Sequence, residues 1–156
     1  MEPLKLKNYL LIPLAKWLMD QELPGRMSRS RNRFLDIIRP RFEEIENTRL
    51  ELGKKHAKKD EKGNPIEIEQ DGVKRFDMTD EGREAFRKDY TEYINEESVF
   101  DVTAANEADM KVVAKVVLET DEKFSDAPEN PIATHYSEWC TAFEQAKLTP
   151  EQQPAA

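Results

Sequence analysis

The sequence is poor in the residues that form covalent or metal cross-links. It has one cysteine, Cys140, and two histidines, His56 and His135, among 156 residues. A single cysteine cannot form an intramolecular disulfide, which is typical of a protein kept in a reducing compartment. A zinc site needs clustered ligands, and His135 and Cys140 lie five positions apart, so they do not share one face of a helix. We therefore expect no metal and no cofactor.

Long apolar runs and glycine-rich loops are also missing. The longest apolar run, from Tyr9 to Leu14, is far shorter than the ~20 residues of a membrane-spanning helix. The five glycines are scattered, so none builds a phosphate-binding loop. Cys140 lies on the aromatic-rich face of a predicted helix, where a buried core residue is the simpler interpretation than a nucleophile paired with histidine. We predict a protein that is not an enzyme, does not contact a membrane and lies in the cytoplasm.

Positive charge is outweighed by negative charge. The chain carries 24 Lys and Arg against 32 Asp and Glu, which gives a formal net charge of -8. This balance argues against non-specific nucleic-acid binding, which needs a broad basic face, but it allows a local anion site. Hydrophobic residues make up 38% of the chain, enough for a modest core. We expect a single α+β domain over residues 1–147 and a flexible tail over residues 148–156.

Hydrophobic periodicity predicts a mainly helical α+β fold. Alternation over residues 4–7 and 99–102 predicts two short strands. Alternation over residues 66–69, followed by the hairpin signal Asp71-Gly72, predicts an antiparallel hairpin over residues 66–76. Apolar residues at helical spacing predict about five helices, which begin at Asn8, at Ser28 or Ser30, at Thr79 or Asp80, near Thr103 or Asn106, and at Asn130.

Two prolines fall within the predicted helices. Pro13 is best tolerated if it lies in the first turn of its helix. Pro40 lies inside the longest helix, which we expect to run to about Ala57. A proline there removes one backbone hydrogen bond and crowds the preceding turn, so a kink is predicted.

The most distinctive feature is the segment from Gly25 to Phe34, which contains four arginines and no lysine. On a helix, Arg29 and Arg33 share a face away from the apolar side, whereas Arg31 lies within roughly 60° of Phe34 and Ile38. A guanidinium beside an apolar stripe needs a partner, because an unpaired buried charge is costly.

Two interpretations of these arginines are open. In one, Arg31 pairs with an internal carboxylate and the other three are solvated or bridged to acidic residues. In the other, the free N–H groups of the helix start and the cluster formed by Arg26, Arg29, Arg31 and Arg33 bind an anion, since the arginine fork suits phosphate. Residues Trp17, Tyr136 and Trp139 are candidates for stacking against a base.

Several short motifs carry a family resemblance. They are Leu4-x-Leu6-x-Asn8, Leu23-x-Gly25, Ser28-Arg29-x-Arg31-x-x-Phe34-Leu35, residues 59–65 (KDEKGNP) and residues 136–144 (YSEWCTAFE). Together they resemble a family of small uncharacterised proteins of tailed phages and prophages. The resemblance implies a phage gene product made in the cytoplasm of a bacterial host, and it brings no catalytic residues. Pro40 departs from the pattern.

Three functions follow as hypotheses. The first is a non-enzymatic protein that sequesters a small phosphorylated or nucleotide ligand through the arginines, plausible as a counter-defence protein that removes a nucleotide signal of host immunity. The second is a virion or assembly protein. The third is an inhibitor that binds a host factor through its acidic surface. For each of them we also expect self-association into a homo-oligomer.

Overall fold

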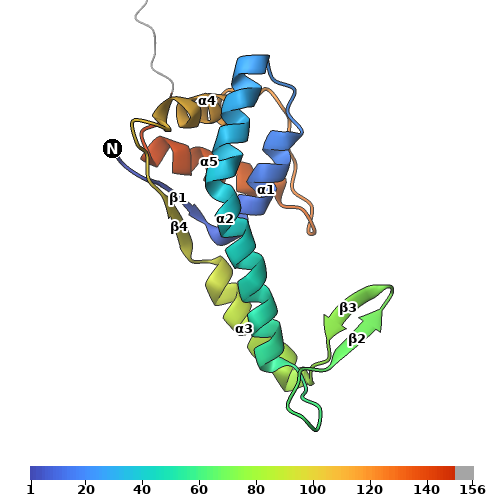
Figure 1. Ribbon diagram of the computed structural model, residues 1–156. Helices are drawn as coiled ribbons and strands as arrows, with labels where there is room; N and C mark the ends of the chain where they lie inside the picture. The colour runs from blue at the N-terminus through green and yellow to red at the C-terminus, as the bar shows by residue number, and fades with distance from the viewer. Residues whose placement is uncertain (150–156) are drawn as a thin grey trace, which may run out of the picture. The chain divides into compact units, whose positions relative to one another are not determined.

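The computed structural model describes residues 1–149, and their fold is α+β and mainly helical, as predicted. The described chain contains the helices α1 (Asn8–Met19), α2 (Gly25–His56), α3 (Asp80–Ile94), α4 (Glu107–Leu118) and α5 (Ile132–Gln145) and the strands β1 (Leu4–Lys7), β2 (Glu67–Gln70), β3 (Val73–Phe76) and β4 (Glu97–Phe100) (Figure 1). The strands form two antiparallel pairs, β1 with β4 and β2 with β3.

The chain divides into two compact units. Unit 1 comprises Met1–Phe42 together with the chain from Glu97 onward, and unit 2 comprises Glu43–Glu96. Helix α2 supplies residues to both, because the division falls within it. Helix α2 continues through Pro40 as one uninterrupted helix. The single domain over residues 1–147 stays a prediction, and most of the predicted tail lies outside the described residues.

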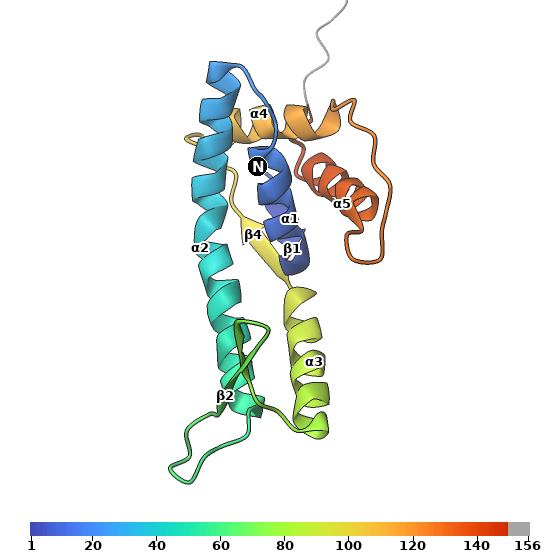
Figure 2. The same cartoon turned by 90° about the vertical axis from the view of Figure 1, so that its right-hand side faces the viewer.

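Unit 1 contains most of the buried side chains. Strand β1 lies opposite β4 with Leu4 facing Phe100 and Leu6 facing Ser98, and these four residues are buried. Helix α5 packs against α1, α4 and β1, and these elements can be followed in Figure 2. The largest fully buried side chains of the described residues all belong to this unit: Trp139, Phe34, Phe143, Leu4, Leu6, Leu11, Leu14, Leu18, Ile38, Met110, Leu148 and Val113.

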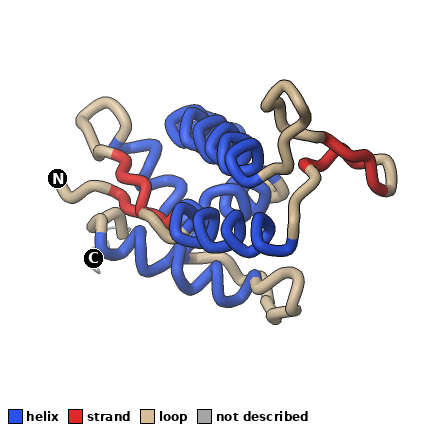
Figure 3. The backbone as a smooth tube through the Cα atoms, turned by 90° about the horizontal axis from the view of Figure 1, so that it is seen from below, coloured by secondary structure: helices blue, strands red, loops and turns tan. Residues whose placement is uncertain are grey.

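Unit 2 consists of the second part of α2, the hairpin β2–β3 and helix α3 (Figure 3). The hairpin forms at the predicted Asp71-Gly72 turn, where both residues have positive φ, 53° and 78°. This is the backbone that a tight two-residue hairpin turn requires. Ile45 and Ala57 are the only buried hydrophobic residues that the described chain places in this unit, and no residue of α3 is buried.

Two predicted helix starts differ from the structure because the side chains expected to cap them bond to other groups, distant ones for Asn8 and Ser30 and a local one for Ser28. Lys7 rather than Asn8 is the N-cap of α1, and the Asn8 side chain instead accepts a hydrogen bond from Ser98. Helix α2 begins at Gly25, three residues before the nearer predicted cap. The Ser28 hydroxyl donates back to the Gly25 carbonyl and the Ser30 hydroxyl to Asp109, so neither serine caps the helix.

The later helix starts follow the predictions in part. The Thr79 hydroxyl caps α3 by accepting from the Gly82 N–H at 3.0 Å, as predicted. Helix α5 starts without a side-chain cap from Asn130. There the Asp126 carboxylate accepts from both the N–H and the hydroxyl of Thr134, and these bonds lower the pKa of Asp126.

Three further positions depart from the predictions. Pro13 lies inside α1 rather than in its first turn. Strand β4 begins at Glu97 and ends at Phe100, two residues earlier than predicted, because it is placed by pairing with β1. Leu148, assigned from the sequence to the tail, is 1% exposed, and its N–H donates to the Phe143 carbonyl.

Candidate functional site

Arg31 binds the carboxyl end of helix α1. Its Nη1 donates to the carbonyl oxygen of Leu18 at 3.0 Å and to that of Gln21 at 2.6 Å. Helix α1 ends at Met19, so Leu18 belongs to its last turn and Gln21 to the segment just after it. The Leu18 carbonyl also accepts from the Gln21 N–H at 3.2 Å. Both carbonyls lie at the negative end of the helix dipole. The partner of Arg31 is therefore internal, but it is a pair of backbone carbonyls rather than a carboxylate.

The other three arginines of the cluster have different surroundings. Arg33 lies 3.6 Å from Asp109 of α4, which also accepts from the Ser30 hydroxyl. Arg26 and Arg29 are exposed, and within residues 1–149 neither forms an ion pair. The structure thus separates the four: Arg31 and Arg33 hold α2 to its neighbours, while Arg26 and Arg29 point to solvent. Their assignment as ligand-binding residues stays a prediction.

The three candidate stacking residues lie together in unit 1. The ring centroids of Trp17 and Trp139 are 5.8 Å apart, and Tyr136 stacks on Phe124 at 4.8 Å. Trp139 is fully buried, and its Nε1 donates to the Leu10 carbonyl. These rings pack against one another, so in this conformation Trp139 offers no free face to a base. Their role in stacking a ligand also stays a prediction.

The Tyr136 hydroxyl is tied into the same cluster. It donates to the Val117 carbonyl at 2.7 Å, and burial raises the pKa of Tyr136 to about 12. Burial also raises the pKa of the neighbouring Cys140 thiol. A thiol whose pKa is raised is a poor nucleophile at neutral pH. Cys140 is only partly buried, so its prediction as a buried core residue is wrong; the buried residues of α5 are Trp139, Ala142 and Phe143.

A buried polar network in unit 1 was not predicted from the sequence. Asn8 and Ser98 are each 2% exposed, and the Ser98 hydroxyl donates to Asn8 Oδ1 at 2.5 Å. Arg41 Nε donates to the same serine at 2.9 Å. The network joins the start of α1, strand β4 and helix α2 within unit 1, and it explains why a polar Asn8 follows β1 directly.

The larger of two pockets lies in unit 2 and has a volume of about 620 Å³. We call it the hairpin pocket, because strand β3 forms one of its walls and helices α2 and α3 form the others. Its lining residues are Arg49, Leu50, Gly53, Glu67, Val73, Lys74, Arg75, Phe76, Met78, Arg83 and Phe86. The lining therefore combines apolar side chains with four cationic ones and one carboxylate.

The backbone around the hairpin pocket depends on two glycines. A Cβ on Gly53 would lie 2.7 Å from Cδ2 of Phe76, so the missing side chain lets this ring lie against α2. A Cβ on Gly82 would lie 2.7 Å from the His56 carbonyl oxygen, so Gly82 lets the start of α3 approach the end of α2. Real Cβ atoms essentially never come this close to another heavy atom.

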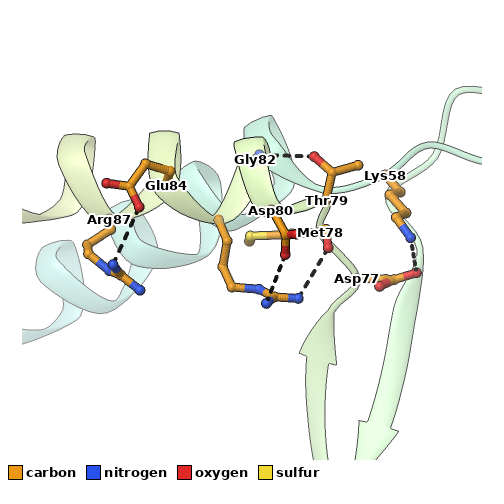
Figure 4. A network of polar contacts seen from close by, with 9 residues as sticks. Lys58, Asp77, Met78, Thr79, Asp80, Gly82, Glu84 and Arg87 are labelled. Atoms are coloured by element: carbon orange, nitrogen blue, oxygen red, sulfur yellow. Dashed lines mark hydrogen bonds and ion pairs between the residues drawn. The ribbon is translucent and has the colours of Figure 1, made fainter.

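Polar contacts fix the strand-to-helix corner beside the hairpin pocket (Figure 4). Lys58 lies 3.4 Å from Asp77, and its N–H donates to the Asp77 carbonyl at 2.7 Å. Next to this corner, the Thr79 hydroxyl caps α3. At the end of α2, Asp89 accepts a 2.7 Å hydrogen bond from His56, which lowers the pKa of Asp89.

The four cations of the hairpin pocket are not equivalent. Arg49 binds Glu46 through two hydrogen bonds, of 3.1 and 2.7 Å, and this pairing raises the pKa of Arg49. Arg83 lies 3.6 Å from Asp80 and donates to the Met78 carbonyl. Across the part of the chain that the structure describes, Lys74 and Arg75 form no ion pair. They are the cations left to meet an incoming anion.

The smaller pocket lies in unit 1 and has a volume of about 190 Å³. Lys5 and Lys7 line it together with Glu97 and Glu138, so its charges balance and it favours neither sign of ligand. Beside it, the Tyr9 hydroxyl donates to Glu138 at 2.6 Å. Burial and this hydrogen bond raise the pKa of Tyr9 to about 12.

The hairpin pocket was missed in the sequence because its walls come from three separated segments. The available signals were the two cations between apolar residues in Val73-Lys74-Arg75-Phe76 and the glycine at position 53 inside a long helix. Each signal has a structural explanation of its own. Only the packing of the hairpin on α2 and α3 brings them to one cavity.

Comparison with known proteins gives no relative for this chain: no family model, no curated protein and no solved structure matches it. The resemblance to phage and prophage proteins therefore stays a prediction. Within residues 1–149, no helix is long and apolar enough to span a membrane. In the same residues, no group of three or more His, Cys, Asp or Glu side chains is placed to hold a metal ion.

Proposed function

We propose that the protein is a non-enzymatic binding protein that captures a phosphorylated ligand, and that the hairpin pocket is its site. The observation that carries the proposal is the lining of this pocket, where Lys74 and Arg75 stand beside apolar side chains without an ion-pair partner in the described chain. Pockets that combine apolar walls with a few polar groups are the usual form of small-ligand sites. Cations in such a place favour an anion.

The arginine-rich start of α2 is the weaker candidate for this site. Two of its cations, Arg31 and Arg33, already bind the end of α1 and Asp109. The Nη1 group of Arg31 is already engaged by two carbonyl oxygens, and its Nε is buried. Neither Arg26 nor Arg29 lines the hairpin pocket or the smaller pocket of unit 1. The proposal therefore keeps the ligand class expected from the sequence and moves the site to unit 2.

A second candidate function is assembly with another protein. The supporting observation is the low burial of unit 2, in which α3 has no buried residue. A helix with a hydrophobic face that its own chain covers only in part is common in proteins that bind a partner. This candidate corresponds to the virion or assembly protein, or to the host-factor inhibitor, expected from the sequence.

Calorimetric titration of the purified protein tests the proposal. The titrants are a panel of cyclic nucleotides and ADP-ribose-type nucleotides, and a nucleotide signal of host immunity would be among them if the phage resemblance holds. We expect saturable binding of at least one compound, and loss of that binding in Arg75→Glu but not in Arg29→Glu. The absence of binding by every phosphorylated compound would refute the proposal. A stoichiometric complex with a protein, without small-ligand binding, would favour the second candidate.

A further inference from the structure

The apolar part of the hairpin pocket restricts what its ligand can be. Val73 is 52% exposed and Leu50 is 36% exposed, although both line the pocket. Phe76, Met78 and Phe86 add partly exposed apolar surface. A compact anion such as inorganic phosphate would leave this surface in water, whereas a ligand with an apolar body would cover it and gain the hydrophobic contribution.

The cationic part of the pocket restricts the charge of the ligand. Arg49 and Arg83 already have carboxylate partners, so the charge available to a ligand comes from Lys74 and Arg75, neighbours in β3. Successive side chains of a strand point to opposite faces, so Arg75 shares a face with Val73 and Lys74 lies on the other. A planar guanidinium can bind two phosphate oxygens at once, so one phosphate group matches Arg75. Glu67, also in the lining, disfavours a second anionic group close by.

The volume of the pocket fits a ligand that has both an apolar body and a phosphate group. A volume of about 620 Å³ lies within the ~300–1,000 Å³ of ordinary small-molecule sites. Gly53 lets the Phe76 ring lie against α2 as one wall of this space, because a side chain at Gly53 would meet that ring. We infer that the pocket selects a phosphate ester with a sizeable apolar or aromatic body over compact phosphates. This inference rests on the proposed function and names its ligand class.

A phosphate ester of this kind has two possible sources. In a nucleotide, the body is an aromatic base, and in a lipid phosphate it is an acyl chain. The chemistry that the pocket recognises is the same in both: one phosphate on β3 and one apolar group against α2 and α3. Separate arms of one titration experiment distinguish them.

The experiment titrates the full-length protein with four probes: a set of mononucleotides and cyclic nucleotides, a short-chain phosphatidic acid below its micelle concentration, inorganic phosphate, and an acidic peptide containing phenylalanine. We expect one ester class to bind at least about tenfold more tightly than inorganic phosphate, which corresponds to ~1.4 kcal/mol. The ester that binds identifies the source.

Matched variants locate the binding and separate its two parts. Arg75→Glu is expected to weaken ester binding at least about tenfold, with Arg29→Glu unchanged as the control for charge. Val73→Ser is expected to weaken the ester but not inorganic phosphate. Ile68→Ser is its control, because Ile68 is an exposed residue of the same hairpin that does not line the pocket. Melting temperatures confirm that each variant is folded.

Each contrary result has a distinct meaning. Equal affinity for the esters and inorganic phosphate would overturn the inference and leave the proposed function standing. No binding by any phosphorylated probe would overturn both. Tighter binding of the acidic peptide than of every ester would also overturn the inference, in favour of a protein partner. Loss of ester binding in Arg29→Glu, with Arg75→Glu unaffected, would move the site to the start of α2.

Discussion

The two units of this chain differ in how they are held together. Unit 1 buries Trp139, Phe34 and Phe143 completely, and its cations Arg31 and Arg33 connect one helix to another. Unit 2 buries only Ile45 and Ala57 among its described hydrophobic residues. Its cohesion comes from close backbone approaches at Gly53 and Gly82 and from polar contacts such as that between His56 and Asp89.

This difference in burial indicates which unit we expect to bind a ligand. Burial of apolar surface is the dominant favourable contribution to folding, so unit 1 supplies most of the stability of the chain. An isolated two-stranded hairpin is only marginally stable in water, and the strands of unit 2 form one such pair. A unit with little buried surface and an open pocket gains stability when a ligand covers that pocket. We therefore expect the proposed ligand to bind in unit 2 rather than in unit 1.

The largest effect on stability is expected from truncating one aromatic side chain in each unit. Trp139→Ala is expected to lower the free energy of unfolding by ~3–5 kcal/mol, as for a fully buried tryptophan. Phe86→Ala in unit 2 is expected to cost less than about 2 kcal/mol, because Phe86 is only partly buried. Urea denaturation followed by circular dichroism measures both. Equal losses of unfolding free energy in the two variants would show that the two side chains stabilise the protein equally despite their unequal burial.

The next effect concerns the arginine cluster. Arg31→Met is expected to lower the free energy of unfolding by ~1–3 kcal/mol, because it removes two hydrogen bonds from a charged donor. The Gln21 carbonyl loses that donor, while the Leu18 carbonyl keeps the Gln21 N–H. Arg29→Met, its matched control, is expected to change stability by no more than about 0.5 kcal/mol. Chemical denaturation gives both values. If ligand binding and not stability were lost in Arg31→Met, the arginine would belong to a binding site.

An effect of similar size is expected at one of the glycines. Gly82→Ala places a Cβ against the His56 carbonyl oxygen, a backbone atom that cannot rotate away, so we expect a loss of ~1–3 kcal/mol, the usual cost of overpacking. Gly25→Ala is the control, because nothing lies within 4 Å of its added Cβ. Thermal melts compare the two. A neutral Gly82→Ala would mean that α3 does not press on the end of α2.

The smallest effects are in the pH dependence, and they have opposite directions in the two units. The lowered pKa of Asp89 stabilises unit 2 above the ordinary aspartate pKa, and this contribution is lost as the pH falls through the lowered value. The pKa of Tyr9, about 12, stabilises unit 1 below the ordinary tyrosine pKa of ~10, and this contribution is lost as the pH rises toward 12.

Two conservative variants check these directions. Asp89→Asn is expected to flatten the acid limb of the stability–pH curve, and Tyr9→Phe is expected to flatten the alkaline limb. Denaturation midpoints across the pH range provide the measurement. An acid limb that is unchanged in Asp89→Asn would remove this aspartate as a source of acid sensitivity.

Local sequence signals predicted the elements well wherever a short pattern decides the structure alone. Strand residues 4–7, the Asp71-Gly72 hairpin and the Thr79 cap are confirmed. Each depends on neighbours within a few residues, through alternation, positive φ or a side chain that reaches its own helix start. The helical spacing of α2 up to its end at His56 is decided in the same way.

Capping and partner choice were not predictable in the same way. Asn8, Ser28 and Ser30 all have side chains suited to capping, yet Asn8 and Ser30 bond to Ser98 and Asp109, far away in the sequence. A short polar side chain can satisfy either a local or a distant group. Which of them it meets depends on the packing of other elements, and a helical pattern does not report that packing.

The sequence by itself determined the fold class, the order of the elements and the need of Arg31 for a partner, because periodicity and side-chain chemistry are local properties. Only the tertiary structure decided that this partner is the carbonyl end of α1. It alone also assembled the hairpin pocket, from residues as distant as Arg49 and Phe86. The Arg31 contact and the hairpin pocket both depend on segments that are far apart in the chain, and the way those segments pack sets the geometry.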